Sequence, residues 1–315
     1  MPEWTKKPSR PVRIAILLFD RFSNLCLANC IEPLRAANTL GARMVFDWQI
    51  FSPDGQTVRS SSGIDILARG PATDIVAPDY VFVMASYAHD GHDTLTNRAL
   101  LRRIARLNAV TVGFDAGPWL LASAGLLDGR AATVHWDLLD AFSERFLNVE
   151  ARRAHVVRDG AIMTCAGAIS ALEMTLDLIA DHEGLAARLD VQAFFSQGDP
   201  PIGPSDRVAD PLVREALSLM RDHVERPLLL VDLAKRLSCQ PRTLDRHFRN
   251  RLGAPPGTVY RHLRLSAARK LLEDTQLSVS EISVRCGYDS PAALTRAIRR
   301  NYGATPRAIR QARIC

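Results

Sequence analysis

Four short apolar runs, separated by stretches with helical periodicity, constrain the fold of the first two thirds of this chain more than any other feature. A near-continuous apolar run is typical of a strand covered on both faces, because neither side of it meets water. The runs are Val12–Phe19, Phe46–Phe51, Tyr80–Met84 and Ala109–Phe114. The helical stretches are Leu25–Thr39, Asn97–Arg106, Pro118–Ala124, Trp136–Phe146 and Ser170–His182. Strands that alternate with helices predict an α/β domain, a parallel sheet with helices on both faces.

A span rich in proline and glycine interrupts this pattern. The sequence SQGDPPIGPSDRVADP, residues 196–211, has no helical or strand periodicity and is typical of a linker. After it the strand pattern stops and only helical patterns follow. We therefore expect a first domain at residues 10–195, a linker at 196–211 and an all-α domain at 212–315.

The net charge of +6 is distributed unevenly between these parts. Residues 206–315 contain 21 Lys and Arg against 11 Asp and Glu, so they carry +10, and the preceding residues carry −4. A basic domain behind an acidic one indicates a polyanionic partner, most simply nucleic acid. The charged start MPEWTKKPSRP is unlike a signal peptide, and no apolar run is long enough to span a bilayer. We expect a cytoplasmic protein that does not contact membranes.

The cysteines argue against a metal centre. They are scattered and form no Cys-x-x-Cys pair, so we expect reduced thiols, no metal and no cofactor. The six are Cys26, Cys30, Cys165, Cys239, Cys286 and Cys315.

A helix-turn-helix pattern begins the basic third. Leu233–Leu237 is predicted to be a helix, Ser238–Pro241 a turn and Arg242–Phe248 a second helix with several arginines on one face. A helix with a basic face behind a tight turn fits the major groove of DNA. A solvated charged face would be the better explanation if a helix of this kind occurred only once.

The pattern recurs fifty residues later, which favours DNA binding over a solvated face. The second unit begins at Val279, turns at residues 286–290 and continues in a helix from Pro291, for which Ser290 is a suitable N-cap. A long helix over Val259–Glu273 is predicted to connect the units. The matching positions are Leu244, Arg246, Arg249 and Gly253 with Leu294, Arg296, Arg299 and Gly303.

Residues 212–310 resemble the paired helix-turn-helix domain of AraC/XylS-type transcription regulators, including the ending Tyr302-Gly303-Ala304-Thr305-Pro306. The resemblance implies binding to double-stranded promoter or operator DNA, with base contacts from Arg242, Asp245, Arg246, Pro291, Ala292, Thr295 and Arg296. The chemistry of arginine predicts phosphate contacts, which set affinity rather than sequence preference, for Arg249, Arg251, Arg299 and Arg300.

The last apolar run of the first domain ends in Gly113-Phe114-Asp115-Ala116-Gly117. The frame is that of a strand-to-helix turn that presents a nucleophile in many α/β enzymes, although a carboxylate occupies the nucleophile position. Ligands of parallel sheets bind beyond the carboxyl ends of the strands. Asp115 is therefore predicted to lie at a ligand-binding edge of the sheet.

Residues 12–180 resemble the class I glutamine amidotransferase-like domain of the PfpI type, most specifically in DAGPWLLASAGLLDGRAATVHW. The resemblance implies a flavodoxin-like, doubly wound sheet. Joined to an AraC-type domain, it is the architecture of GlxA-type regulators. Catalytic relatives have a cysteine, a histidine and a carboxylate at the positions that Asp115, His135 and Cys26 occupy here. Because the thiol and its acid are missing, we expect a sensor and not an enzyme. A hydrolase with an Asp115 nucleophile and a His135 base remains the alternative.

A carboxylate among aromatic rings suits a cationic amine. The predicted ligand-binding residues are Asp115, Trp119, His135, Trp136, Glu32 and Tyr87. Three competing roles remain open: Asp115 caps the following helix, Trp119 and Phe114 belong to the core, or Glu32 forms a surface pair with Arg35.

The first helix, with Glu32-Pro33-Leu34-Arg35-Ala36-Ala37-Asn38, resembles GlxA-type members that regulate catabolism of carnitine, glycine betaine or arginine. This resemblance implies a small-molecule effector of that kind and places Glu32 or Asn29 near the pocket. The family also implies a homodimer that activates transcription through RNA polymerase.

Overall fold

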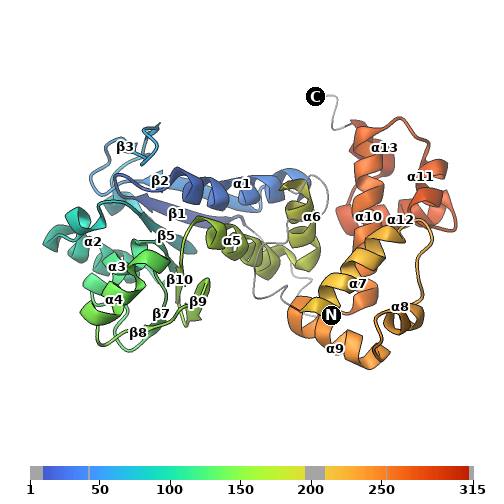
Figure 1. The fold of residues 1–315 in the computed structure, drawn as a ribbon. Coiled ribbons are helices and arrows are strands. Elements are labelled where there is room, and N and C mark those ends of the chain that lie inside the picture. Colours follow the sequence, from blue (N-terminus) through green and yellow to red (C-terminus); the bar gives the residue numbers. More distant parts are fainter. Residues whose placement is uncertain (1–9, 42, 196–209, 253, 312–315) are drawn as a thin grey trace. The chain divides into compact units, whose positions relative to one another are not determined.

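The computed structural model describes residues 10–41, 43–195, 210–252 and 254–311 (Figure 1). The chain divides into two compact units, Met1–Gln197 and Gly198–Cys315, each with its own hydrophobic core. Most of the predicted linker, residues 196–209, lies outside the described residues.

The first unit is built on a six-stranded sheet with the order β2-β1-β5-β6-β10-β9. The four predicted strands are confirmed as β1 (Val12–Leu18), β2 (Phe46–Phe51), β5 (Tyr80–Ala85) and β6 (Val110–Asp115). Neighbouring strands among these four pair in parallel, as the alternation with helices predicted. The fold is therefore of the predicted doubly wound class.

One edge of the sheet was not predicted. β10 (Ile162–Cys165) lies parallel to β6, and β9 (Val156–Asp159) lies antiparallel to β10 at the edge. The two strands are joined by a tight turn in which Gly160 has a φ of 62°. Both strands are four residues long, too short for an apolar run to be recognised.

Helices cover both faces of the sheet (Figure 1). α1 (Asn24–Gly41), α5 (Ala168–Glu183) and α6 (Leu185–Phe195) pack together on one face. Their core includes Ile14, Ile16 and Phe114 from the strands.

The opposite face is covered by α2 (Leu95–Ala105), α3 (Gly117–Ser123) and α4 (Leu139–Arg145), which pack on Ala15, Leu17, Val81 and Val83. The alternation of the two core clusters along β1 is the expected consequence of side chains pointing to opposite faces of a strand. The smaller elements of this unit are β3 (Val58–Arg59), β4 (Asp65–Ile66), β7 (Ala131–Ala132), β8 (Glu150–Ala151), η2 (Ala72–Asp74), η3 (His89–His92) and η4 (Trp136–Leu138).

The described part of the second unit is helical throughout, as predicted. Its helices are α7 (Pro211–Asp222), α8 (Leu230–Arg236), α9 (Pro241–Leu252), α10 (Pro256–Asp274), α11 (Val279–Arg285), α12 (Pro291–Tyr302) and α13 (Pro306–Gln311). α8 and α9 form the first helix-turn-helix unit, α11 and α12 the second, and α10 is the predicted long connector (Figure 1).

The internal repeat is visible in the burial of the two second helices. Residues 241–250 and 291–300 have the same sequence of buried, half-buried and exposed positions. Leu244 and Phe248 of α9 are buried, and so are Leu294 and Ile298 of α12. Apolar residues at i and i+4 thus fix each helix to its unit and leave the arginine-bearing face exposed.

Within the described ranges, no helix is long and apolar enough to cross a membrane. The same residues contain no cluster of His, Cys, Asp and Glu that could hold a metal ion.

Candidate functional site

Asp115 occupies a sharp turn between β6 and α3. Its φ of 61° lies in the left-handed region, which Asp adopts more readily than bulky residues. The Asp115 carbonyl accepts a hydrogen bond from the His135 amide at 3.0 Å, and the next amide, that of Ala116, bonds to the Ala85 carbonyl at 2.8 Å. Main-chain hydrogen bonds to His135 and to Ala85 therefore fix the turn that places the Asp115 carboxyl group at the end of the sheet.

The two glycines of the Gly-x-Asp-x-Gly frame have separate steric reasons. A Cβ atom on Gly117 would lie 2.3 Å from the carbonyl oxygen of Val83. A Cβ atom on Gly113 would lie 2.9 Å from Leu121 Cδ1 and 3.0 Å from the nitrogen of Pro118. Only glycine allows α3 to approach the sheet this closely, so the frame reflects packing as well as function.

The carboxyl group of Asp115 is largely removed from water. Burial raises its pKa above the ordinary value, while a hydrogen bond from Ser86 and the nearby His135 and His89 act in the opposite direction. Within the described part of the chain, Asp115 forms no ion pair with Lys or Arg. The group is thus a largely desolvated carboxyl that accepts a hydrogen bond from Ser86 and lies near two imidazoles.

Buried thiols occupy the space where catalytic relatives are expected to carry an acid. A hydrogen bond with Cys30, followed by burial and the proximity of Asp115, raises the pKa of Cys26 well above its ordinary value. Burial does the same for the pKa of Cys165. These cysteines are free and buried, so they are inert thiols at neutral pH.

Three residues predicted around the ligand are placed around the Asp115 turn. The His135 amide bonds to Asp115, and the ring Nδ1 accepts a hydrogen bond from the Asp137 amide at 3.4 Å. Trp136 is 67% exposed, and its ring centroid lies 5.4 Å from that of His135. Tyr87 is 60% exposed and follows Ser86 directly. The two exposed aromatic rings thus belong to residues that follow His135 and Ser86, the neighbours of the Asp115 carboxyl.

The packing of Trp119 favours a place in the core. This side chain is 6% exposed, and its ring lies 6.1 Å from Phe142 and 5.3 Å from Phe146. Its ring also lies 4.9 Å from His89, one of the imidazoles that influence Asp115. Trp119 therefore supports the site through His89.

Capping and hydrogen bonding define the roles of Asp115 and Glu32. Asp115 does not cap the helix that follows it, because the N-cap of α3 is Ala116 and no side chain caps the helix. Glu32 accepts a hydrogen bond from Arg35 Nε at 2.7 Å, which is the predicted surface pair. Asn29 donates to the Ala168 carbonyl at 2.8 Å.

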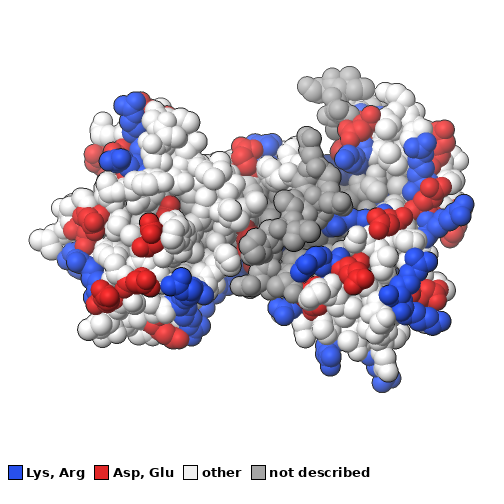
Figure 2. Space-filling model, viewed as in Figure 1, with Lys and Arg blue, Asp and Glu red and all other residues white. Residues whose placement is uncertain are grey.

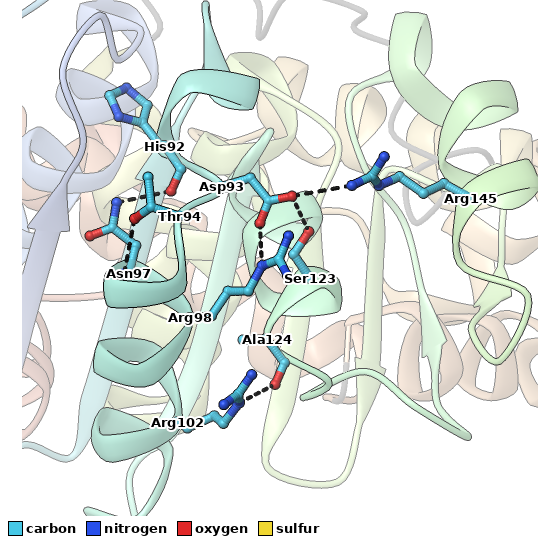
Figure 3. Close-up of polar contacts among 9 residues, drawn as sticks. All are labelled: His92, Asp93, Thr94, Asn97, Arg98, Arg102, Ser123, Ala124 and Arg145. Carbon is cyan, nitrogen blue, oxygen red and sulfur yellow. Dashed lines mark hydrogen bonds and ion pairs between the residues drawn. The ribbon is translucent and has the colours of Figure 1, made fainter.

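A buried ion cluster holds the loop that carries the unpredicted site residues Ser86 and His89. The carboxylate of Asp93 has a 7% exposed side chain and accepts bonds from Arg98 at 2.7 Å, Ser123 at 3.0 Å and Arg145 at 3.4 Å (Figure 3). The hydrogen bond from Arg98 lowers the pKa of Asp93. The loop at residues 86–93 is thus anchored at Asp93.

The other end of that loop is also fixed. Ser86 Oγ accepts a hydrogen bond from the Ser23 amide at 2.8 Å, which places its hydroxyl between the start of α1 and Asp115. Ser86 and His89 follow the apolar run that ends at Met84, and this position at the carboxyl end of a strand was the available sequence signal.

The predicted DNA-contacting residues of α9 lie on its surface. Arg242 and Arg246 are exposed, and Asp245 is half-buried. Asp245 accepts a hydrogen bond from Arg249 Nε at 2.7 Å, so these two side chains form an ion pair along the helix. Figure 2 shows Lys and Arg side chains at many points on the visible surface of the second unit.

α12 presents a corresponding surface. Its N-cap is Ser290, whose hydroxyl accepts from the Ala293 amide at 3.2 Å, so the predicted helix start is confirmed. The exposed residues of this helix are Pro291, Ala292, Arg296, Arg299, Arg300 and Asn301, and Thr295 is half-buried. Both second helices thus expose the arginines predicted to meet DNA, while Asp245 and Thr295 are half-buried.

Comparison with known proteins agrees with this arrangement. The model of the DJ-1/PfpI family matches residues 12–181, and that of a helix-turn-helix domain matches residues 233–312. The HTH-type transcriptional regulator GlxA of Rhizobium meliloti (strain 1021) is 35% identical over 309 residues, covering 95% of each chain. The HTH-type transcriptional regulator CdhR of Pseudomonas aeruginosa is 33% identical, covering 92% of this chain and 89% of CdhR.

A solved structure supports the fold of the first unit. The crystal structure of an AraC family transcriptional regulator from Pseudomonas putida superposes with a TM-score of 0.53 at 24% identity, covering 59% of this chain and all of that one.

An α/β unit with a partly buried carboxyl at its strand ends, joined to two helix-turn-helix units, defines a DNA-binding transcription regulator. GlxA and CdhR, both HTH-type transcriptional regulators, match this chain over nearly its whole length, across both of its parts. The chain belongs to the GlxA-type regulators, in which a DJ-1/PfpI domain precedes an AraC-type helix-turn-helix domain. It is accordingly a regulator and not the hydrolase that the Asp115 and His135 pair allowed as an alternative.

Proposed function

We propose that this regulator activates transcription in response to a small cationic amine bound beside Asp115. The observation that carries the proposal is a desolvated carboxyl with no Lys or Arg partner in the described part of the chain. Burial penalises its charge, so a bound cation would offset a cost that the free protein bears. The resemblance to GlxA-type regulators supports carnitine, glycine betaine or arginine as the chemical type.

The surroundings of Asp115 support this ligand class. Trp136 and Tyr87 supply exposed aromatic faces, on which a quaternary ammonium or guanidinium group can stack. His135 and Ser86 border the carboxyl group. Glu32 pairs with Arg35, so we propose for it at most a place at the edge of the site.

The response requires the ligand to bind two states of the regulator unequally. We propose that these states differ in how the DNA-binding units of a homodimer are placed, and that one of them recruits RNA polymerase. The loop at residues 86–93 is a suitable element to respond, because it carries Ser86 and His89 and is tied to α2, α3 and α4 through Asp93.

DNA recognition is proposed to divide between the exposed arginines of each second helix. Arg242, Arg246 and Arg296 would read base edges, with Asp245, Ala292 and Thr295 completing the contact surface. Arg249, Arg251, Arg299 and Arg300 would meet phosphates. Replacing Arg246 with Ala should then relax sequence preference, whereas Arg299→Ala should weaken selected and random duplexes alike and make the salt dependence shallower.

The ligand proposal is tested by fluorescence titration of the full-length protein. All four tryptophans (Trp4, Trp48, Trp119 and Trp136) precede the second unit in the chain, and the three that the structure describes, Trp48, Trp119 and Trp136, belong to the first unit and report on it. The probes are glycine betaine, carnitine, choline and arginine, with neutral analogues of the same shape.

We expect saturable binding of one cationic probe, lost in Asp115→Asn, which keeps the shape and tolerates the positive φ. Asp137→Asn is the matched control, because Asp137 is an exposed carboxylate that directly follows Trp136 in η4. Equal binding by wild type and Asp115→Asn, or equal loss in both variants, would contradict the proposal.

A further inference from the structure

Asp210, the first described residue of the second unit, forms a hydrogen bond with α9, which is the DNA-contacting (recognition) helix of the first helix-turn-helix unit in the proposed function. It is the N-cap of α7, and its Oδ1 accepts a hydrogen bond from the Leu212 amide at 3.1 Å. Its Oδ2 lies 2.5 Å from Nδ1 of His247 and 3.9 Å from Nε of Arg251, both on α9. The Asp210 residue is 8% exposed. A single buried carboxylate thus joins the start of α7 to α9.

The charges of this contact are defined by its chemistry. Burial works against the charge of Asp210, but the bond with His247 and bonds from backbone amides lower its pKa below the ordinary value. The group is therefore a carboxylate, which can only accept hydrogen bonds, so Nδ1 of His247 carries the proton. Hydrogen bonds of this kind, to a charged partner, are stronger than those between neutral groups.

The internal repeat shows that a recognition helix does not need this bond in order to fold. Fifty residues after His247 and Arg251 stand Ala297 and Asn301. Position 297 is half-buried like position 247, and α12 has the same length as α9 and the same burial pattern over its first ten residues, without an ion pair at this place. The Asp210 to His247 bond is therefore a feature added to the first unit.

We propose that the Asp210 to His247 bond, supported by Arg251, is a positioning device for α9. His247 directly follows the exposed Arg246, so the bond fixes the rotation and tilt of the helix segment that presents Arg246 to a base edge. Because Asp210 is the last residue but one of the predicted linker, residues 196–211, movement of residue 210 would also change the presentation of α9. The inference rests on the proposed function only in that α9 reads bases.

The test uses the full-length protein and duplexes that it selects from a random-sequence library. Affinity is measured for a selected duplex, for its single-base variants and for a scrambled duplex, at several salt concentrations. His247→Ala installs the residue that the repeat carries, and His247→Asn keeps a donor near the place of Nδ1. Asp210→Asn keeps the oxygen that caps α7 and removes the charge.

We expect His247→Ala to bind the selected duplex about tenfold more weakly, which corresponds to about 1.4 kcal/mol. The scrambled duplex and the salt dependence should be unchanged, because no phosphate contact is lost. The base positions that lose preference should be those that Arg246→Ala relaxes, while those that respond to Arg296→Ala stay intact. His247→Asn should retain most of the preference, and Asp210→Asn should behave like His247→Ala.

Two results would overturn the proposal. If His247→Ala and Asp210→Asn keep the wild-type base preference, the bond only stabilises the fold. If His247→Ala weakens all duplexes equally with a shallower salt dependence, His247 is a phosphate contact. Failure of the proposed function would give a different result. If α9 does not read bases, Arg246→Ala itself leaves every base preference unchanged.

Discussion

Replacing Gly117 with alanine tests whether the turn that presents Asp115 depends on a close backbone approach. The added Cβ would lie 2.3 Å from the carbonyl oxygen of Val83 and 3.2 Å from its carbon. Favourable contacts between heavy atoms lie at about 3.5 Å, so α3 and β5 would have to separate by roughly 1 Å. The obstructing atoms belong to the central sheet and cannot rotate away as a side chain can.

The expected cost follows from this geometry. Overpacking of a core costs about 1–3 kcal/mol, and a clash with backbone belongs at the upper end of that range. For a unit of this size, 1 kcal/mol shifts the unfolding midpoint by about 2–4 °C, so Gly117→Ala should melt about 6–12 °C below wild type. The helical signal of the second unit should melt unchanged if the two units unfold independently.

Tryptophan fluorescence is the suitable assay, because the three described tryptophans, Trp48, Trp119 and Trp136, all lie in the first unit. Gly91→Ala is the control: Gly91 lies in η3, and a Cβ there would have no neighbour within 4 Å. Its midpoint should stay within about 2 °C of wild type, the range of an ordinary surface change. A Gly117→Ala midpoint equal to that of the control would refute the steric argument.

Three further substitutions follow from the contacts of single side chains. Asp115→Asn should raise the stability of the first unit at neutral pH, because burial raises the pKa of Asp115 in the folded state. The gain is present above that raised pKa and disappears below pH 3.8, the ordinary pKa of the group, where the carboxyl is protonated in both states. Urea unfolding at several pH values measures this dependence. Asp93→Asn should cost about 1.5–3 kcal/mol of stability at neutral pH, because it weakens the bonds from Arg98 and Arg145. Since the pKa of Asp93 is lowered in the folded state, this loss fades as the pH falls through that lowered value. A loss independent of pH would contradict the charged state assigned to Asp93. Ser290→Ala should remove about 1 kcal/mol from the second unit, measured by far-UV circular dichroism, and an unchanged midpoint would mean that water replaces the cap.

The sequence by itself determined four strands of the central sheet, the helices that alternate with them and the two helix-turn-helix units, although not the short strands β9 and β10. Apolar runs identified β1, β2, β5 and β6 because a strand buried on both faces must be apolar at nearly every position. The fifty-residue repeat and the Ser290 cap identified the second helix-turn-helix unit, since each copy of the repeat and the cap are patterns of residues close together in the chain. The frame around Asp115 was readable for the same reason.

Only the tertiary structure decided which distant side chains meet. Trp119 was predicted at the ligand, but packing against Phe142 and Phe146 places it in the core. Ser86 and His89 border Asp115 because the β5 and β6 ends are neighbours in the sheet.

The bond between Asp210 and His247 joins residues that are 37 positions apart in the sequence, and no local pattern relates one to the other. Periodicity records which face of an element is buried. The partner on that face is fixed only when the elements pack, and in this protein that packing gives Asp115 its desolvated surroundings and α9 its ionic tie.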